Sequence, residues 1–317
     1  MGRYILKRLL VIIPVFLCIT FFVYILSNLA PGGPLDAIRA SGGMTEEAMD
    51  ALRAAYGLDK PLVVRYFLWL GDVLTGDLGI STRTQQPVFA LIQERIGPTL
   101  ILTGTSVLVS ILIAIPLGTM SAKKPYSVWD NVSSAISFIG SSIPNFFVAL
   151  VLVYFISVQL NLLPATNMWY NNQPRTFWNL LQHLIMPVFV LVIQTLGNLL
   201  KQTRGAMLEV FNEEYIKTAR AKGLPESVVT IKHVLRNALI PIVTTLSLEI
   251  PFLVGGAAVT EQIFAWPGMG TLMVLSITQR DYNTIMGCTV VIAAAVLLVN
   301  LVLDIVYAFL DPRIRFD

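Results

Sequence analysis

Carboxylates that could move protons or hold a charged solute are few within the apolar runs of this chain. Glu249 lies near the middle of one run, beside Ser247, and Asp304 lies near the end of the last run. An unpaired carboxylate in hydrocarbon is costly, so Glu249 either faces a wet pathway and meets a solute, for example an amino group, or hydrogen-bonds to Ser, Thr or Asn on neighbouring helices. For Asp304 we expect a helix-end or interhelical contact.

Sequence motifs for catalysis or for energy coupling are missing. The dipeptide Gly-Lys never occurs, so there is no phosphate-binding GxxxxGK[ST] loop, and neither HExxH nor GxSxG is found. His183 and His233 lie far apart, and Cys18 and Cys288 both fall inside apolar runs. We therefore predict no catalytic residue, no metal site and no cofactor in this chain, and another component must supply energy for any active process.

The composition is that of a membrane protein. Of the 317 residues, 55% are hydrophobic and 13% are charged, and the mean hydropathy is +0.72. A soluble domain of this size could not bury so much apolar surface, so the bilayer must be the solvent. The net charge of +3 is modest and gives no reason to expect nucleic acid as a partner.

Six apolar runs are long enough to cross a bilayer as helices, which takes roughly 20 residues each. They lie near 9–30, 99–120, 134–158, 180–200, 237–259 and 284–310. The first run is longer than the apolar core of a cleaved signal, so we predict an uncleaved span. With the N-terminus inside, the inner segments hold 14 of the 22 Lys and Arg residues, which predicts that both termini are cytoplasmic.

The sequence thus predicts an all-α polytopic membrane protein in three parts: a first transmembrane helix at 1–30, an extracytoplasmic helical loop at 31–98, and a five-helix core at 99–317. Within the loop, Thr45 can cap a helix that ends at Gly57, and Pro61 opens a second helix before the turn GDLGIS at 76–81. This loop forms either a structured cap over the spans or a simple interfacial anchor.

The segment 212–236 is polar and basic, and it lies between two apolar runs. Asn212 can cap a short helix with Glu213 and Glu214 in its first turn, which suits the helix dipole. Gly223 stands where a helix-ending glycine is expected, and Pro225 prevents continuation. Such a well-delimited helix suggests docking to a partner; the alternative is an ordinary cytoplasmic loop whose basic residues only set the topology.

An outer turn, Trp266-Pro267-Gly268, follows the fifth run. It could serve as an outer gate or as the contact for a binding protein. Alternatively, the tryptophan could be an anchor at the membrane interface.

Five sequence features, taken in order, resemble those of ABC importer permeases of the dipeptide, oligopeptide and nickel family, and the resemblance runs almost the whole length. They are LAPGGP after the first run, YGLDKPL with GDLGIS, the PVFALIQERIGPTL lead into the second run, the EAA-type segment YIKTARAKGL with His233 and LRNALIP, and GAAVTEQIFAWPGMG with RDY at 280–282. Lys217-Thr218-Ala219 replaces the Glu-Ala-Ala of the wider motif, as is typical of the peptide branch.

The resemblance implies that Tyr215 through Leu224 form a coupling helix that fits a groove on an ATPase subunit. Tyr215, Ile216 and Ala219 would share the inserting face, with Lys217, Arg220 and Lys222 beside it. The full set of residues implied in ATPase coupling is Tyr215, Ile216, Thr218, Ala219, Arg220, Ala221, Lys222, Gly223, Leu224, His233, Leu235, Arg236 and Asn237.

The function implied by the resemblance is that of a non-catalytic permease subunit, which moves di- or oligopeptides inward across the plasma membrane. Its partners would be a second homologous permease, two ABC ATPase subunits that bind ATP and Mg, and an extracytoplasmic solute-binding protein. Alternatives are import of nickel, glutathione or an oligosaccharide by the same kind of permease, or a stand-alone channel or ion-coupled carrier.

Overall fold

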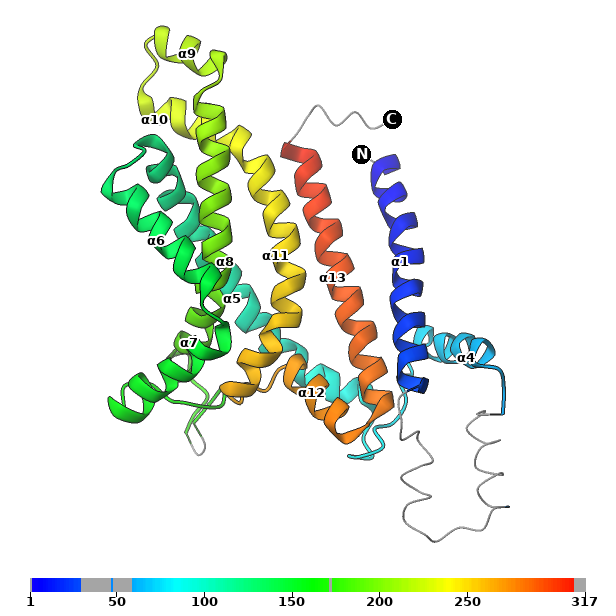
Figure 1. The fold of residues 1–317 in the computed structure, drawn as a ribbon. Helices are drawn as coiled ribbons and strands as arrows, with labels where there is room; N and C mark the ends of the chain where they lie inside the picture. Colours follow the sequence, from blue (N-terminus) through cyan, green and yellow to red (C-terminus); the bar gives the residue numbers. More distant parts are fainter. Residues whose placement is uncertain (1, 30–46, 48–58, 171–172, 311–317) are drawn as a thin grey trace.

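Long helices carry the apolar runs of the sequence. The computed structural model describes residues 2–29, 47, 59–170 and 173–310, and that part of the chain is nearly all helical (Figure 1). The five longest helices are α1 (Gly2–Leu29), α5 (Val88–Lys123), α8 (Phe177–Phe211), α11 (Arg236–Ile263) and α13 (Tyr282–Leu310).

Shorter elements join these helices. They are α4 (Leu62–Leu74), α6 (Val128–Ser142), α7 (Asn145–Leu152), the π-helical segment η1 (Val153–Gln159), α9 (Glu214–Ala221), α10 (Glu226–Val228), the π-helical segment η2 (Val229–Leu235) and α12 (Met269–Gln279). Two ends of the molecule can be distinguished in Figure 1: α9 and the start of α1 lie at one end, whereas α4, α7 and α12 lie at the other. We call these the α9 end and the α12 end.

The run predicted as a single third span at 134–158 is broken. Its two halves, α6 and α7 with η1, meet at an angle of 101°. Pro144 disfavours the helical conformation of the residue before it, and Ile143 is accordingly extended at φ −95°, ψ 126°. The prediction of one continuous helix is therefore wrong at this point.

Four of the described helices are long and apolar enough to cross a membrane, and a fifth is added if the bent pair is counted as one span. The predicted run at 237–259 lies inside α11, which has 28 residues. In the second run the helix begins earlier than predicted, because α5 starts at Val88 and residues 88–98 of the predicted outer loop are helical. The count of six spans remains a prediction.

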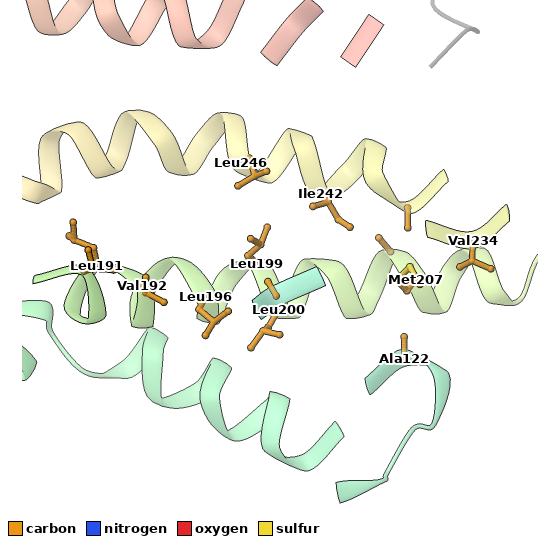
Figure 2. Close-up of a cluster of buried hydrophobic side chains, with 14 of the residues drawn as sticks. Ala122, Leu191, Val192, Leu196, Leu199, Leu200, Met207, Val234, Ile242 and Leu246 are labelled. Carbon is orange, nitrogen blue, oxygen red and sulfur yellow. The ribbon is translucent and has the colours of Figure 1, made fainter. Parts of the chain in front are cut away.

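The core is built around α8, which packs against α5, α6 and α11. Figure 2 shows α8 side chains between α11 on one side and α5 and α6 on the other. Leu199 and Leu200 of α8 and Ile242 of α11 are completely buried. Since lipid is as apolar as these side chains, close van der Waals packing, rather than escape from water, stabilises such contacts in a membrane.

A glycine permits the closest crossing in this core. A Cβ atom added to Gly140 of α6 would lie 2.1 Å from the carbonyl oxygen of Ile193 in α8. Gly197 faces Gly140 across the same crossing, with Ser137 O 3.1 Å from its hypothetical Cβ. Small residues are therefore required where these two backbones meet.

Helices α1 and α13 pack against one another beside this core. Arg8 and Asp304 form an ion pair of 3.2 Å between them, which confirms the interhelical contact expected for Asp304. At the far end of α1, α4 packs by Tyr66, whose hydroxyl lies 2.9 Å from Thr20 Oγ1. The sequence correctly predicted this second loop helix, whereas the helix expected from Thr45 to Tyr56 lies outside the described residues.

The turn GDLGIS and the RDY segment, which are 200 residues apart, lie together at the α12 end. Asp281 is buried, and its carboxylate accepts hydrogen bonds from Ser81 Oγ (2.5 Å) and Thr284 Oγ1 (2.7 Å). Asn283 Nδ2 donates to Ile80 O across 2.8 Å. These bonds hold the end of the GDLGIS turn against the start of α13.

Candidate functional site: coupling helix and polar face

The helix α9 has the boundaries of a rigid, projecting element. Its N-cap position is Glu213, not Asn212 as predicted, because Asn212 ends α8 and donates from Nδ2 to Leu208 O at 3.0 Å. At the other end Gly223 has φ +79°, and two bonds close the helix: Gly223 N to Arg220 O (2.9 Å) and Leu224 N to Ala219 O (3.4 Å). This is the Schellman pattern, which confirms the predicted role of Gly223 in ending the helix.

The buried face of α9 is turned toward its own chain. Ile216 is 0% exposed and Ala219 is 8% exposed, and both belong to the main core cluster together with Met207 of α8 and Val229 of η2. The predicted inserting face of Tyr215, Ile216 and Ala219 is therefore wrong for two of its three members, because these side chains already pack within the permease.

The surface that α9 leaves exposed consists of other predicted coupling residues. Tyr215 is 45% exposed and Leu224 is 38% exposed. The remaining exposed members of the predicted set in this segment are Thr218, Arg220, Ala221, Lys222 and Gly223, and Lys217, which was expected beside the inserting face, is exposed as well.

Charged contacts brace this helix. Arg220 donates to Glu226 of α10 through Nη2 (2.8 Å) and Nε (3.2 Å), and its guanidinium lies 5.7 Å from the Phe211 ring centre. These hydrogen bonds lower the pKa of Glu226 and raise that of Arg220. Arg220 thus holds α9 to α10, and does not only flank a contact surface.

From Glu226 the chain runs without a break through α10 and η2 into α11. π-Helical turns are uncommon, and they occur frequently at functional sites. His233 and Leu235 are half-buried in η2, whereas Arg236 and Asn237 are exposed at the start of α11. Asn237 Nδ2 donates to His233 O at 2.7 Å, so this predicted pair does lie together.

The half-exposed Glu249 carboxylate belongs to a polar face on α8 and α11. Asn198 Nδ2 donates to Glu249 Oε1 across 2.8 Å, which is the neighbouring-helix hydrogen bond that was one of the two sequence alternatives. Ser247 instead donates to Thr244 O of its own helix at 2.7 Å. On the adjoining turn of α8, Gln194 Oε1 accepts from Asn145 Nδ2 of α7.

The exposed residues of α8 continue this polar face toward the α9 end. Asn198, Lys201 and Gln202 are all exposed there, at the spacing of one side of a helix. Away from the ends of α1 and α13, the exposed residues are instead mostly apolar, for example Leu10, Phe22, Leu298 and Val302. Since unsatisfied polar groups are costly in hydrocarbon, the α1 and α13 surfaces suit lipid and the α8–α11 face suits water or a partner.

The outer turn is built differently from the sequence prediction. Trp266 is completely buried, and its Nε1 donates to Pro98 O at 3.0 Å. Its indole is therefore not presented at the surface to lipid or to a binding protein. Pro267 is partly exposed, and it lines a cavity of about 340 Å³ together with Asn167, Met168, Trp169, Tyr170, Gln173 and Arg175.

Glu261 fixes this turn, and the sequence analysis missed it. The side chain is fully buried; Oε1 accepts from Thr99 Oγ1 (2.7 Å) and Oε2 from Thr271 N (2.9 Å). The second bond satisfies one of the free amides at the start of α12. A Cβ atom on Gly268 would lie 2.1 Å from Glu261 Oε1, so the glycine of the WPG turn makes room for the carboxylate.

Asp130 was also missed. It is buried at the start of α6, and it accepts from Arg204 of α8 through two bonds, Nε to Oδ1 (2.5 Å) and Nη2 to Oδ2 (2.9 Å). Ser121 Oγ donates a further bond at 2.5 Å, and Tyr126 N another at 2.7 Å. Within the described ranges, no group of three or more His, Cys, Asp or Glu side chains is arranged to hold a metal ion.

Comparison with known proteins identifies the family. Residues 114–316 match the model described as "Binding-protein-dependent transport system inner membrane component", and residues 1–103 match the model of the N-terminal part of such membrane components. Among curated relatives, the oligopeptide transport system permease protein AppB of Bacillus subtilis is 42% identical over 317 residues, covering 100% of both chains. The dipeptide transport system permease protein DppB of Escherichia coli K12 is 34% identical over 338 residues, covering 99% of both.

A solved structure has a similar fold. A chain of the MetNI methionine ABC transporter, in an inward-facing conformation, superposes with a TM-score of 0.56 at 19% identity, covering 70% of this chain and 96% of that one. This likeness concerns the fold alone. Together with the matches over the whole length, it shows that the chain is a multi-pass plasma-membrane protein and belongs to the family of inner-membrane permease components of binding-protein-dependent ABC transport systems.

Proposed function

We propose that this chain is a permease subunit of an ATP-driven importer of di- or oligopeptides. The relatives named above are oligopeptide and dipeptide permeases, and they match over the whole chain. In this proposal the chain has six spans and is itself non-catalytic. A second homologous permease completes the pathway, two ATPase subunits bind ATP and Mg, and an extracytoplasmic binding protein delivers the peptide.

The position of α9 supports coupling to the ATPases more than any other observation. The helix projects at one end of the molecule, and it is anchored by Ile216 and closed by Gly223. The predicted cytoplasmic excess of Lys and Arg falls at the same end. The exposed surface of α9, which includes Tyr215, Thr218, Lys222 and Leu224, then contacts an ATPase subunit. Arg236 and Asn237 border it.

The polar face of α8 and α11 lines the pathway in this proposal, and Glu249 belongs to it. The cap at the α12 end, which includes the partly exposed Pro267, faces the binding protein. Trp266 and Gly268 act from inside the turn by holding it in shape, and the turn can serve as an outer gate. Rocking of α8 and α11 would open the polar face to one side of the membrane and then to the other.

The test begins with affinity purification of this chain from its native membrane in mild detergent. We expect a second permease and P-loop ATPases to co-purify, and the complex in proteoliposomes to take up a dipeptide only with ATP and the binding protein. Uptake of nickel, glutathione or an oligosaccharide instead of peptide would change the assigned substrate. A chain that purifies alone and transports without an ATPase would be a channel or carrier.

Coupling through α9 has its own test, the variant Gly223→Leu. A left-handed conformation costs a residue with a side chain about 1–2 kcal/mol, so the closure of α9 should be distorted. We expect loss of binding-protein-stimulated ATP hydrolysis with normal membrane insertion. Gly104→Leu is the matched control, because nothing lies within 4 Å of a Cβ atom at that exposed helical position. Normal transport by Gly223→Leu would refute coupling through α9.

A further inference from the structure

Hydrogen-bonding capacity remains open on the polar face of α8 and α11. Glu249 Oε1 accepts from Asn198, but a carboxylate can accept about four hydrogen bonds. Asn145 Nδ2 is used by Gln194, whereas the buried Asn145 Oδ1 has no hydrogen-bond partner among the described residues. Among the described residues, the half-exposed Glu249 carboxylate is therefore the acceptor with positions open to a ligand, whereas Asn145 Oδ1 has almost no accessible surface.

The position of these groups separates them from the lipid-facing surface. Glu249 is the fourteenth residue of the 28-residue α11, so it lies near mid-span. Asn198, which binds it, is exposed, and Lys201 and Gln202 extend the exposed polar surface toward the α9 end. A carboxylate at this depth is costly unless a cation or water compensates it. The available acceptors call for a ligand that brings positive charge and N–H donors.

We propose that Glu249, positioned by Asn198, binds the α-ammonium group of the transported peptide. This inference rests on the proposed function. It means that the permease, as well as the binding protein, selects for peptides with a free amino terminus. Glu249 sets the preference for a cationic terminus. Asn198 is a positioning residue, because its amide fixes the carboxylate.

The experiment uses the complete permease–ATPase complex in nanodiscs without binding protein, so that only the pathway selects. A cysteine introduced by Gln202→Cys reports on the polar face through its reaction with a charged, water-soluble thiol reagent. L-alanyl-L-alanine and N-acetyl-L-alanyl-L-alanine, which differ in the ammonium group, are added as protecting ligands. We expect the free dipeptide to slow labelling at a concentration about ten- to one-hundred-fold lower, as a charge-assisted hydrogen bond implies.

Glu249→Gln keeps the shape and the acceptor for Asn198 but removes the charge, so it should abolish the difference between the two ligands. Asp304→Asn is the matched control, because it also removes one carboxylate from a span, yet its side chain pairs with Arg8 away from this face. We expect the control to keep the full difference between the ligands.

Each contrary outcome has a distinct meaning. Equal protection by the two ligands, or a difference that survives Glu249→Gln, overturns the inference. A cysteine at 202 that does not react with the reagent overturns it too, because the face is then not aqueous. Loss of the partner permease from the Glu249→Gln complex would assign the carboxylate to a subunit contact instead. Dipeptide uptake by the unaltered complex in the presence of the binding protein is measured as well. If that uptake occurs, a negative result above contradicts the role of Glu249 but not the proposed function.

Discussion

Truncation of the α9 anchor should release the helix from the permease. Ile216 is completely buried, and Ala219 is its buried neighbour on the same face. Ile→Ala substitutions at such sites cost about 2–5 kcal/mol. Because α9 is only eight residues long, little other packing can compensate. The substitution should therefore weaken, by about this amount, the free energy that holds α9 against the rest of the permease.

The magnitude can be converted into a population. A loss of about 2 kcal/mol, the low end of the range, raises the undocked fraction of α9 about 30-fold. Hydrogen exchange of the amides in residues 214–224, measured by mass spectrometry on the complex, should accelerate by that factor or more. Transport and the stimulation of ATP hydrolysis by the binding protein should fall while basal ATP hydrolysis persists, because an undocked helix no longer transmits displacement between the ATPase and the spans.

A matched variant separates packing from side-chain type. Ile231 lies nearby in η2 but is 67% exposed, so Ile231→Ala should leave exchange in α9 within about twofold of the unaltered complex. If Ile216→Ala and Ile231→Ala gave equal exchange, or if Ile216→Ala transported normally, the idea that α9 acts through its packing on its own chain would be refuted.

Two further predictions concern the core and the brace of α9. Gly140→Ala should lower the free energy of unfolding by about 1–3 kcal/mol, because the new Cβ atom would collide with Ile193 O. Gly104→Ala is the control and should be tolerated, because nothing lies within 4 Å of a Cβ atom there. Equal melting temperatures for the two variants would contradict the close crossing. The Arg220 hydrogen bonds lower the pKa of Glu226, so their stabilisation is complete above the ordinary glutamate pKa and is lost as pH falls through the lowered value. Both groups are more than 40% exposed, which limits the effect to less than about 1 kcal/mol. Protection of the α9 amides, measured relative to the intrinsic exchange rate at each pH, should fall at acid pH, and Glu226→Gln should remove that dependence.

Local sequence signals predicted where α9 ends, but they placed its N-cap one residue too early and did not give its orientation. Gly223 and Pro225 end the helix for reasons contained in the segment itself. Which side of an amphipathic helix is buried depends on what surrounds it. Ile216 and Ala219 fit a groove on a partner equally well by sequence, and only the positions of α8 and η2 show that their own chain covers them.

The hydropathy pattern predicted the long helices, but it did not predict the break between α6 and α7. Pro116 and Pro187 lie inside α5 and α8, whereas Pro144 separates α6 from α7. Proline is tolerated in a membrane helix when neighbours satisfy the freed backbone groups, so its effect depends on packing that is not local. The role of Glu261 could not be predicted for the same reason, because its partner Thr99 lies in another helix, 162 residues away in the sequence.

In the proposed function, the coupling helix α9 and the substrate pathway are connected through the same group of helices. The chain enters α9 from α8 and leaves it through α10 and η2 into α11, the two helices that carry Asn198 and Glu249. The buried Asp130 and the partly exposed Arg204 join α6 to α8 by a bidentate pair, and breaking it would leave the buried carboxylate without its cation. A displacement of α9 therefore cannot move α8 alone. We expect it to move α6, α8 and α11 together, so that the Glu249–Asn198 pair can be carried intact from one side of the pathway to the other.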